Sequence, residues 1–274
     1  MNGDADIAGF NQRLRKVIDS RQSRLCVGLD PDIRRLPSSV SRDRPGIEAF
    51  LRTIVDATAE HVAAFKPNLA FFLSLGSWGF DLLSSVREWV PPEIILIGDA
   101  KWGDIDNSAE RYAASAFDVL GFDAVTVNPY QGSDSARPFL QRESHGAFVL
   151  CKTSNPSAGE FQESGTGEPL YAEVARAASD WNSLGNCGLV IGADEVEALA
   201  LARRDAPSLS LLIPGVGAQA GDLAACLAEV GGSHPATFVI NASRSVLYAG
   251  ETGSYWKSSA AEAKRLRGLI NAGL

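Results

Sequence analysis

The chain has 274 residues, a formal net charge of −8 at pH 7 and 45% hydrophobic residues. This length fits one large barrel or two smaller domains, and the composition is that of a globular protein with a buried core rather than a disordered chain. The acidic balance argues against a nucleic-acid partner, which usually needs a basic stripe, although a small anion can still bind at a local positive site.

The N-terminus and the cysteines indicate a cytoplasmic protein. Residues 1–10 contain acids but lack the basic region and apolar run of a signal peptide. No stretch approaches the roughly 18 apolar residues of a membrane span, so we expect no membrane contact. The cysteines are far apart and form no C-x-x-C pair, which is typical of buried, reduced thiols; they are Cys26, Cys151, Cys187 and Cys226.

The first predicted element is a helix over residues 6–21, which we expect to lie across the floor of a barrel. Eight short apolar segments follow, and their continuous rather than alternating hydrophobicity predicts parallel strands that are covered on both faces. They are residues 24–30, 62–67, 94–100, 124–128, 147–152, 188–192, 209–215 and 237–241. Helix-like stretches lie at residues 46–61, 79–89, 108–120, 168–184, 194–204 and 221–230, and one at 258–272 closes the chain.

This regular alternation over residues 1–274 predicts a single α/β domain. Eight strand–helix units favour a closed (β/α)8 TIM barrel over an open doubly wound sheet. No low-complexity linker interrupts these units.

Charged residues end several of the predicted strands on the carboxyl side, where barrel enzymes build their sites. An isolated charge at a strand end is usually a solvated loop residue. Several charges on one rim are harder to explain in that way, because the strand ends of a barrel converge on one mouth. The residues are Asp30, Lys66, Asp99, Lys101 and Lys152.

The segment that follows the third strand carries the densest charge pattern. Asp99 and Lys101 are two residues apart, so on an extended segment their side chains share a face, and Asp104 follows at the turn into a helix. One interpretation is a structural ion pair with Asp104 as a helix N-cap. The other is chemical, because carboxylates destabilise a nearby anionic group while a lysine between them stays protonated and can deliver a proton.

The last two units indicate a phosphate site. A glycine-rich stretch, residues 215–222, follows the seventh strand, and Arg244 follows the eighth. A glycine-rich loop by itself is more often only a turn. In barrels, however, the loops after strands 7 and 8 frequently bind phosphate through backbone N–H groups, and an arginine there adds a bidentate charged contact.

Five motifs together resemble the orotidine 5'-phosphate decarboxylase family, most closely its longer bacterial branch (type 2). The resemblance runs in order from Leu25 to Tyr248, and the combination is specific although D-x-K-x-x-D also occurs in related barrels. The motifs are F-K-P-N at 65–68, D-x-K-x-x-D-I at 99–105, T-V-N-P-Y at 126–130, C-K-T-S-N-P at 151–156 and P-G-V-G-A-Q at 214–219.

The resemblance implies decarboxylation of orotidine 5'-phosphate to UMP in pyrimidine biosynthesis, without a metal or a cofactor. It implies a catalytic tetrad of Lys66, Asp99, Lys101 and Asp104, in which Lys101 protonates the C6 carbanion. Asp104 would reach into the neighbouring subunit's site, so the protein would be a homodimer with shared active sites.

The resemblance also implies the residues that bind the nucleotide. Asp30 and Lys66 would hold the ribose hydroxyls, and Gln219 with Arg244 the phosphate. Ser154 would contact the pyrimidine edge, although Thr153 beside it could serve instead. Ser108 stands where the family usually has threonine, a change that keeps the hydroxyl.

Three other functions remain open at this point. Sugar-phosphate aldolases and decarboxylases of the same superfamily share D-x-K-x-x-D but form an enediolate on Mg²⁺. A Schiff-base aldolase would use Lys66, Lys101 or Lys152, although a lysine flanked by acids is held charged rather than nucleophilic. The third is a catalytically silent barrel that only binds phosphate.

Overall fold

A computed structural model describes residues 9–215, 220–232, 236–251 and 253–274, and its centre is a closed barrel of parallel strands in the order β1 to β8. The predicted TIM barrel and all eight predicted strands are therefore confirmed. The strands are β1 (Leu25–Leu29), β2 (Ala64–Pro67), β3 (Ile95–Trp102), β4 (Ala124–Val127), β5 (Gly146–Lys152), β6 (Cys187–Ile191), β7 (Ser210–Pro214) and β8 (Phe238–Ala242).

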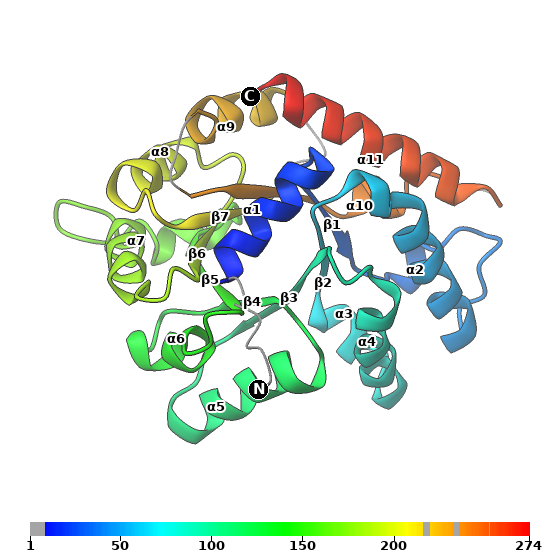
Figure 1. The fold of residues 1–274 in the computed structure, drawn as a ribbon, viewed down its shortest axis with the longest axis horizontal. Helices are drawn as coiled ribbons and strands as arrows, with labels where there is room; N and C mark the ends of the chain where they lie inside the picture. The colour runs from blue at the N-terminus through cyan, green and yellow to red at the C-terminus, as the bar shows by residue number, and fades with distance from the viewer. Residues whose placement is uncertain (1–8, 216–219, 233–235, 252) are drawn as a thin grey trace, which may run out of the picture.

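Helices surround the barrel, as Figure 1 shows. They are α1 (Phe10–Arg21), α2 (Arg44–Thr58), α3 (Leu69–Leu73), α4 (Ser77–Trp89), α5 (Asp106–Ala114), α6 (Ser133–Leu140), α7 (Leu170–Trp181), α8 (Val196–Asp205), α9 (Ala220–Val230), α10 (Arg244–Leu247) and α11 (Tyr255–Ala272). The sequence did not predict α3, α6 or α10. All three are short, and α6 contains Pro138, which is unusual inside a helix.

Alternate residues of each strand face two separate apolar cores. Val27 and Phe65 point outward and pack under the helices, whereas Cys26, Ala64 and Phe148 point into the barrel. Because both faces are buried, the strands are mostly apolar, which explains the nearly continuous apolar runs in the sequence. The four cysteines are free and buried, as predicted.

Helix α1 closes the end of the barrel at which the strands begin (Figure 1). Its apolar face contributes Phe10, Leu14, Val17 and Ile18 to the inner core, and the Phe10 ring meets Phe148 edge-on at 5.9 Å between centroids. The predicted floor helix is thus confirmed for residues 10–21, while residues 6–8 lie outside the described part of the chain.

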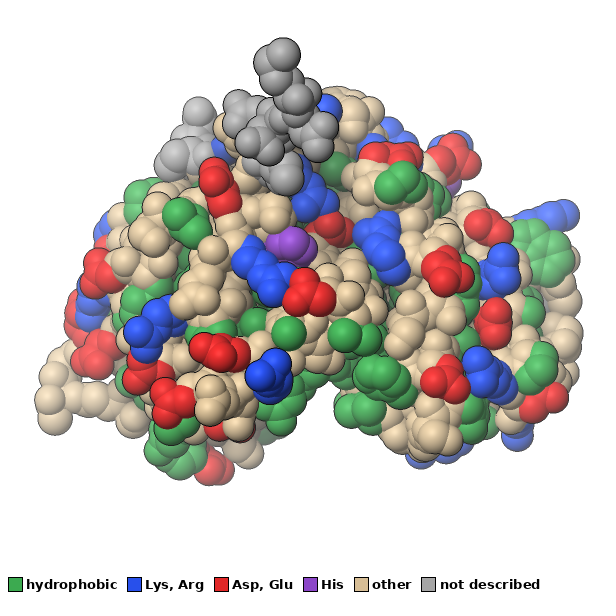
Figure 2. All heavy atoms as spheres, turned by 60° about the horizontal axis from the view of Figure 1, so that its bottom comes forward, with side chains coloured by type: hydrophobic (Ala, Val, Ile, Leu, Met, Phe, Trp, Pro, Cys, Tyr) green, Lys and Arg blue, Asp and Glu red, His purple; other side chains and the backbone are tan. Residues whose placement is uncertain are grey.

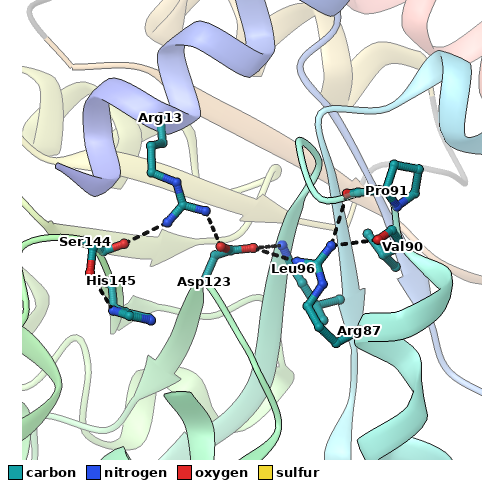
Figure 3. Close-up of polar contacts among 8 residues, drawn as sticks. All are labelled: Arg13, Arg87, Val90, Pro91, Leu96, Asp123, Ser144 and His145. Atoms are coloured by element: carbon teal, nitrogen blue, oxygen red, sulfur yellow. Dashed lines mark hydrogen bonds and ion pairs between the residues drawn. The ribbon is translucent and has the colours of Figure 1, made fainter. Parts of the chain in front are cut away.

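A buried carboxylate fastens this floor helix to the barrel (Figure 3). Asp123, just before β4, forms an ion pair with Arg13 of α1 and another with Arg87 of α4 at 3.1 Å, and it accepts the N–H of Leu96 at 2.8 Å. Arg13 also donates to the carbonyl of Ser144 at 2.9 Å. The network satisfies the buried acid and holds α1 against the end of the barrel at which the strands begin.

The outer surface mixes both charges. On the face drawn in Figure 2, acidic and basic side chains intermingle rather than forming a basic stripe. Among the helices that the structure describes, none combines the length and the apolar character needed to span a bilayer.

Candidate active site

Three charged side chains meet inside the barrel where β2 and β3 approach the mouth. Lys66 Nζ lies 2.6 Å from Asp99 Oδ2, and Lys101 Nζ forms an ion pair with Asp99 Oδ1. Lys66 and Asp99 are buried, at 4% and 8% exposure, whereas nearly half of the Lys101 side chain is exposed. One carboxylate therefore sits between two ammonium groups, of which only Lys101 faces the solvent.

The lysines keep the buried carboxylate ionised. Burial alone would raise the pKa of Asp99, but the charges of Lys66 and Lys101 and their hydrogen bonds outweigh it and lower the pKa to about 2. Burial alone would likewise lower the pKa of Lys66, but Asp99 and then Asp30 outweigh that effect and raise it. The cluster is thus a fixed set of charges at neutral pH.

The backbone of β3 is not simply extended here, contrary to the sequence-based expectation. Lys101 has a φ of 51°, and the pairing of β3 with β4 shifts register between Gly98 and Trp102. The N–H groups of Ala100 and Lys101 both donate to Thr126 Oγ1, at 3.0 and 2.9 Å, which consecutive groups of a regular strand cannot do because they point to opposite sides. This bulge turns Lys101 back toward Asp99.

Thr126 is a site residue that the sequence reasoning did not assign. Its hydroxyl also donates to Asp99 Oδ1 at 3.1 Å, so it contacts the carboxylate and the bulge at once. The sequence feature that could have revealed it is a single inward-facing polar residue in the otherwise apolar strand β4, within the motif T-V-N-P-Y.

Asp104 does not join the cluster of its own chain. Its Oδ1 accepts the N–H of Ile105 at 2.8 Å, and it has no ion pair with Lys101. The N-cap of α5 is Ile105, so the interpretation of Asp104 as the N-cap is wrong. A half-buried acid is therefore left at the rim beside the exposed Ile105.

Asp30 lies on the other side of Lys66, just beyond β1. Its Oδ1 is buried and has no hydrogen-bond partner in the described chain, and the pKa of Lys66 responds to its charge. Gly28 allows Ser243 to approach the strand beside Asp30, because a Cβ at residue 28 would lie 1.9 Å from Ser243 Oγ and 3.2 Å from Asp30 Oδ2. An unsatisfied buried acceptor at a barrel mouth suits a ligand hydroxyl.

The predicted phosphate residues are only partly described. Arg244 begins α10 directly after Ser243, is exposed, and makes no ion pair with the described residues. Residues 216–219 of the glycine-rich stretch, which include Gln219, lie outside the described residues. Ser108 is exposed on the first turns of α5.

The structure separates the two candidates for contact with the base. The Thr153 hydroxyl accepts from Gln162 Nε2 at 2.8 Å and donates to Asn155 Oδ1 at 2.6 Å, so the chain itself satisfies it. Ser154 is exposed, and its side chain makes no hydrogen bond to the described residues. Of the two, Ser154 is the hydroxyl available to a ligand.

Comparison with known proteins matches this architecture. The model of the Orotidine 5'-phosphate decarboxylase / HUMPS family fits residues 23–258. The chain belongs to this family. The orotidine 5'-phosphate decarboxylase of Thermomicrobium roseum is 45% identical over 95% of this chain and 94% of its own, and that of Roseiflexus castenholzii is 47% identical over 97% and 98%. The solved structure of Leishmania donovani OMP decarboxylase covers 97% of this chain and 98% of its own at 37% identity, with a TM-score of 0.85.

Proposed function

We propose that the chain converts orotidine 5'-phosphate to UMP in pyrimidine biosynthesis, with Lys66, Asp99 and Lys101 as its catalytic centre. Membership of the family and relatives of that name at 45–47% identity support the reaction. The observation that carries the mechanism is the buried carboxylate of Asp99 between two ammonium groups.

The proposed chemistry uses these charges directly. Decarboxylation breaks the bond between C6 of the pyrimidine and the carboxylate carbon, and the electron pair stays on C6. Asp99 beside the departing carboxylate raises its energy by like-charge repulsion. The Lys101 ammonium stabilises the carbanion and donates its proton to C6, so the scheme needs neither metal nor cofactor.

Preorganisation explains why such a simple centre can accelerate the reaction. Ion pairs hold the charges of Lys66, Asp99 and Lys101 before substrate arrives. Only interactions that are stronger in the transition state than in the ground state raise kcat, and a charge array that need not reorient acts in this way. The distant phosphate contributes binding energy that holds C6 against Lys101.

The remaining polar residues at the mouth would bind the nucleotide. Asp30 and Lys66 would hold the ribose hydroxyls, which the unpartnered Oδ1 of Asp30 supports. Ser154 would contact the pyrimidine edge, and Arg244 with Gln219 the phosphate. Ser108 would complete the substrate contacts from α5.

We further propose a homodimer in which Asp104 completes the tetrad in the partner's site. Asp104 has no basic partner within its own described chain, which supports a partner elsewhere. The large side chains of Leu73, Ile105 and Tyr130 are exposed after three successive strands on the same rim, β2, β3 and β4. Exposed apolar groups gathered in this way mark an interaction surface.

The test is loss of the orotate chromophore when the purified protein is incubated with orotidine 5'-phosphate, with UMP identified as the product. Unchanged rates in EDTA would favour this function, whereas loss of activity would favour the Mg²⁺-dependent alternative. A covalent adduct after borohydride treatment would indicate a Schiff-base enzyme. Binding of UMP without turnover would indicate the silent barrel.

Free buried cysteines support a cytoplasmic location for the enzyme.

A further inference from the structure

A second buried lysine lies at the mouth, and the proposed chemistry does not use it. Lys152 is the last residue of β5 and is only 4% exposed. Its Nζ lies 3.1 Å from Glu163 Oε1 and 3.1 Å from Glu195 Oε1. A buried ammonium between two carboxylates remains charged, because the acids outweigh the burial and raise the pKa of Lys152.

These two contacts join segments that are separate in the sequence. Glu163 belongs to the loop between β5 and α7, residues 153–169, whereas Glu195 lies after β6 at the N-cap of α8. The N–H of Gly192 also donates to the carbonyl of Lys152 at 3.0 Å. Lys152 therefore ties the far part of its own loop to the rim of the next strand.

The same loop carries Ser154, and its near end is held just as closely. Gln162, next to Glu163, accepts the N–H of Thr153 at 2.8 Å and donates to its hydroxyl. Ser154 in turn packs against Gly192, where an added Cβ would lie 3.2 Å from the Cβ of Ser154. The loop folds back on itself, and Ser154 lies exposed beside Gly192, just after β6.

We propose that Lys152 is a positioning residue that fixes the loop after β5 through Glu163 and Glu195, so that Ser154 is presented to the pyrimidine edge of the nucleotide. The inference rests on the proposed function, because it assumes a nucleotide at the mouth. Lys152 acts through Ser154 and touches no reacting atom. Without the ammonium, Glu163 and Glu195 would repel each other and the loop would lift from the rim.

The experiment compares two ligands that share the ribose phosphate and differ in the base. Calorimetry measures the Kd of UMP and of ribose 5-phosphate for the wild type, Lys152→Met, Ser154→Ala and the double variant. We expect Lys152→Met to raise the Kd of UMP about tenfold, which corresponds to the loss of one hydrogen bond. Binding of ribose 5-phosphate should stay within about twofold, and the double variant should bind UMP no more weakly than either single variant.

Control variants separate positioning from general damage. Lys257→Met removes an exposed lysine from α11 and should leave both affinities unchanged. Lys152→Arg keeps the charge and should recover most of the UMP affinity. If Lys152→Met does not fold, Glu163→Ala removes only the contact to the loop and leaves Lys152 paired with Glu195. This variant should still weaken the binding of UMP selectively.

If Lys152→Met weakened the binding of UMP and of ribose 5-phosphate equally, the inference would be overturned, because the loss would then not depend on contact with the base. Additive losses in the double variant would overturn it too, since Lys152 and Ser154 would act independently. A wild-type protein that binds ribose 5-phosphate but shows no added affinity for UMP would overturn the proposed function itself, and the inference with it.

Discussion

The Thr126 hydroxyl donates to Asp99 Oδ1 at 3.1 Å while it accepts the N–H groups of Ala100 and Lys101. One side chain thus contacts both the carboxylate of Asp99 and the turn that brings Lys101 to it, the two groups that we propose as catalytic. Thr126→Val keeps the shape and removes these bonds, so we expect kcat to fall about 10²-fold, the scale for small misplacement of reacting groups. Thr126→Ser should restore most of the rate. Steady-state kinetics that show wild-type kcat for the valine variant would refute this role.

The depressed pKa of Asp99 predicts a specific dependence of stability on pH. Its pKa is lowered from 3.8 to about 2 in the folded protein, so its contribution is present above pH 4 and is lost as the pH falls toward 2. Urea unfolding should show that wild type is more stable than Asp99→Asn at pH 6, and that the difference shrinks by about 1 kcal/mol at pH 3. An equal difference at both pH values would show that the lysines do not hold Asp99 ionised.

Arg244→Ala tests the phosphate site. If Arg244 contacts only phosphate, its loss should lower kcat/KM for orotidine 5'-phosphate at least about 30-fold, as expected for a charged bidentate contact. The activity on orotidine, which lacks the phosphate, should change little. Arg265→Ala on the outer helix α11 is the matched control. Equal losses on both substrates would mean that Arg244 acts elsewhere.

The barrel could be predicted from the sequence because parallel strands buried on both faces leave a nearly continuous apolar run for each strand. The charged rim could be predicted because Lys66 and Asp99 stand in otherwise apolar strands. A charged residue that is buried in such a strand needs a partner, so these two residues indicated a site. Short elements were missed because α3 and α10 span only five and four residues, too few for a helical period.

The finer geometry of the site left no comparable signal. A left-handed backbone is normally marked by glycine or asparagine, and here it falls on Lys101. The partners of Lys152 lie 11 and 43 residues further along the chain, in stretches that hold other acids as well. The extended backbone at Lys101 was wrong because local spacing does not reveal the bulge in β3 at which Thr126 binds two consecutive N–H groups. The N-cap at Asp104 was wrong because helix α5 begins one residue later, after Ile105.

Mixing of subunits tests the shared site. Asp104→Ala and Lys101→Ala homodimers should each be inactive, because each lacks one member of the proposed tetrad. A mixed dimer holds one site with both defects and one with neither, so random exchange should restore up to about a quarter of wild-type activity. With subunit exchange verified by a tag on one variant, no recovery would mean that Asp104 serves the site of its own chain.

The most direct measurement is the rate of chromophore loss from orotidine 5'-phosphate with wild type and with Lys101→Ala. Lys101 is half exposed at the mouth and is not part of the core, so the variant should still fold into the barrel. We expect turnover by the wild type and a fall in kcat of at least about 10⁴-fold in the variant, because the proposed proton donor and a stabilising charge are both lost. A folded Lys101→Ala protein within tenfold of the wild-type rate would contradict the role of Lys101 as the proton donor.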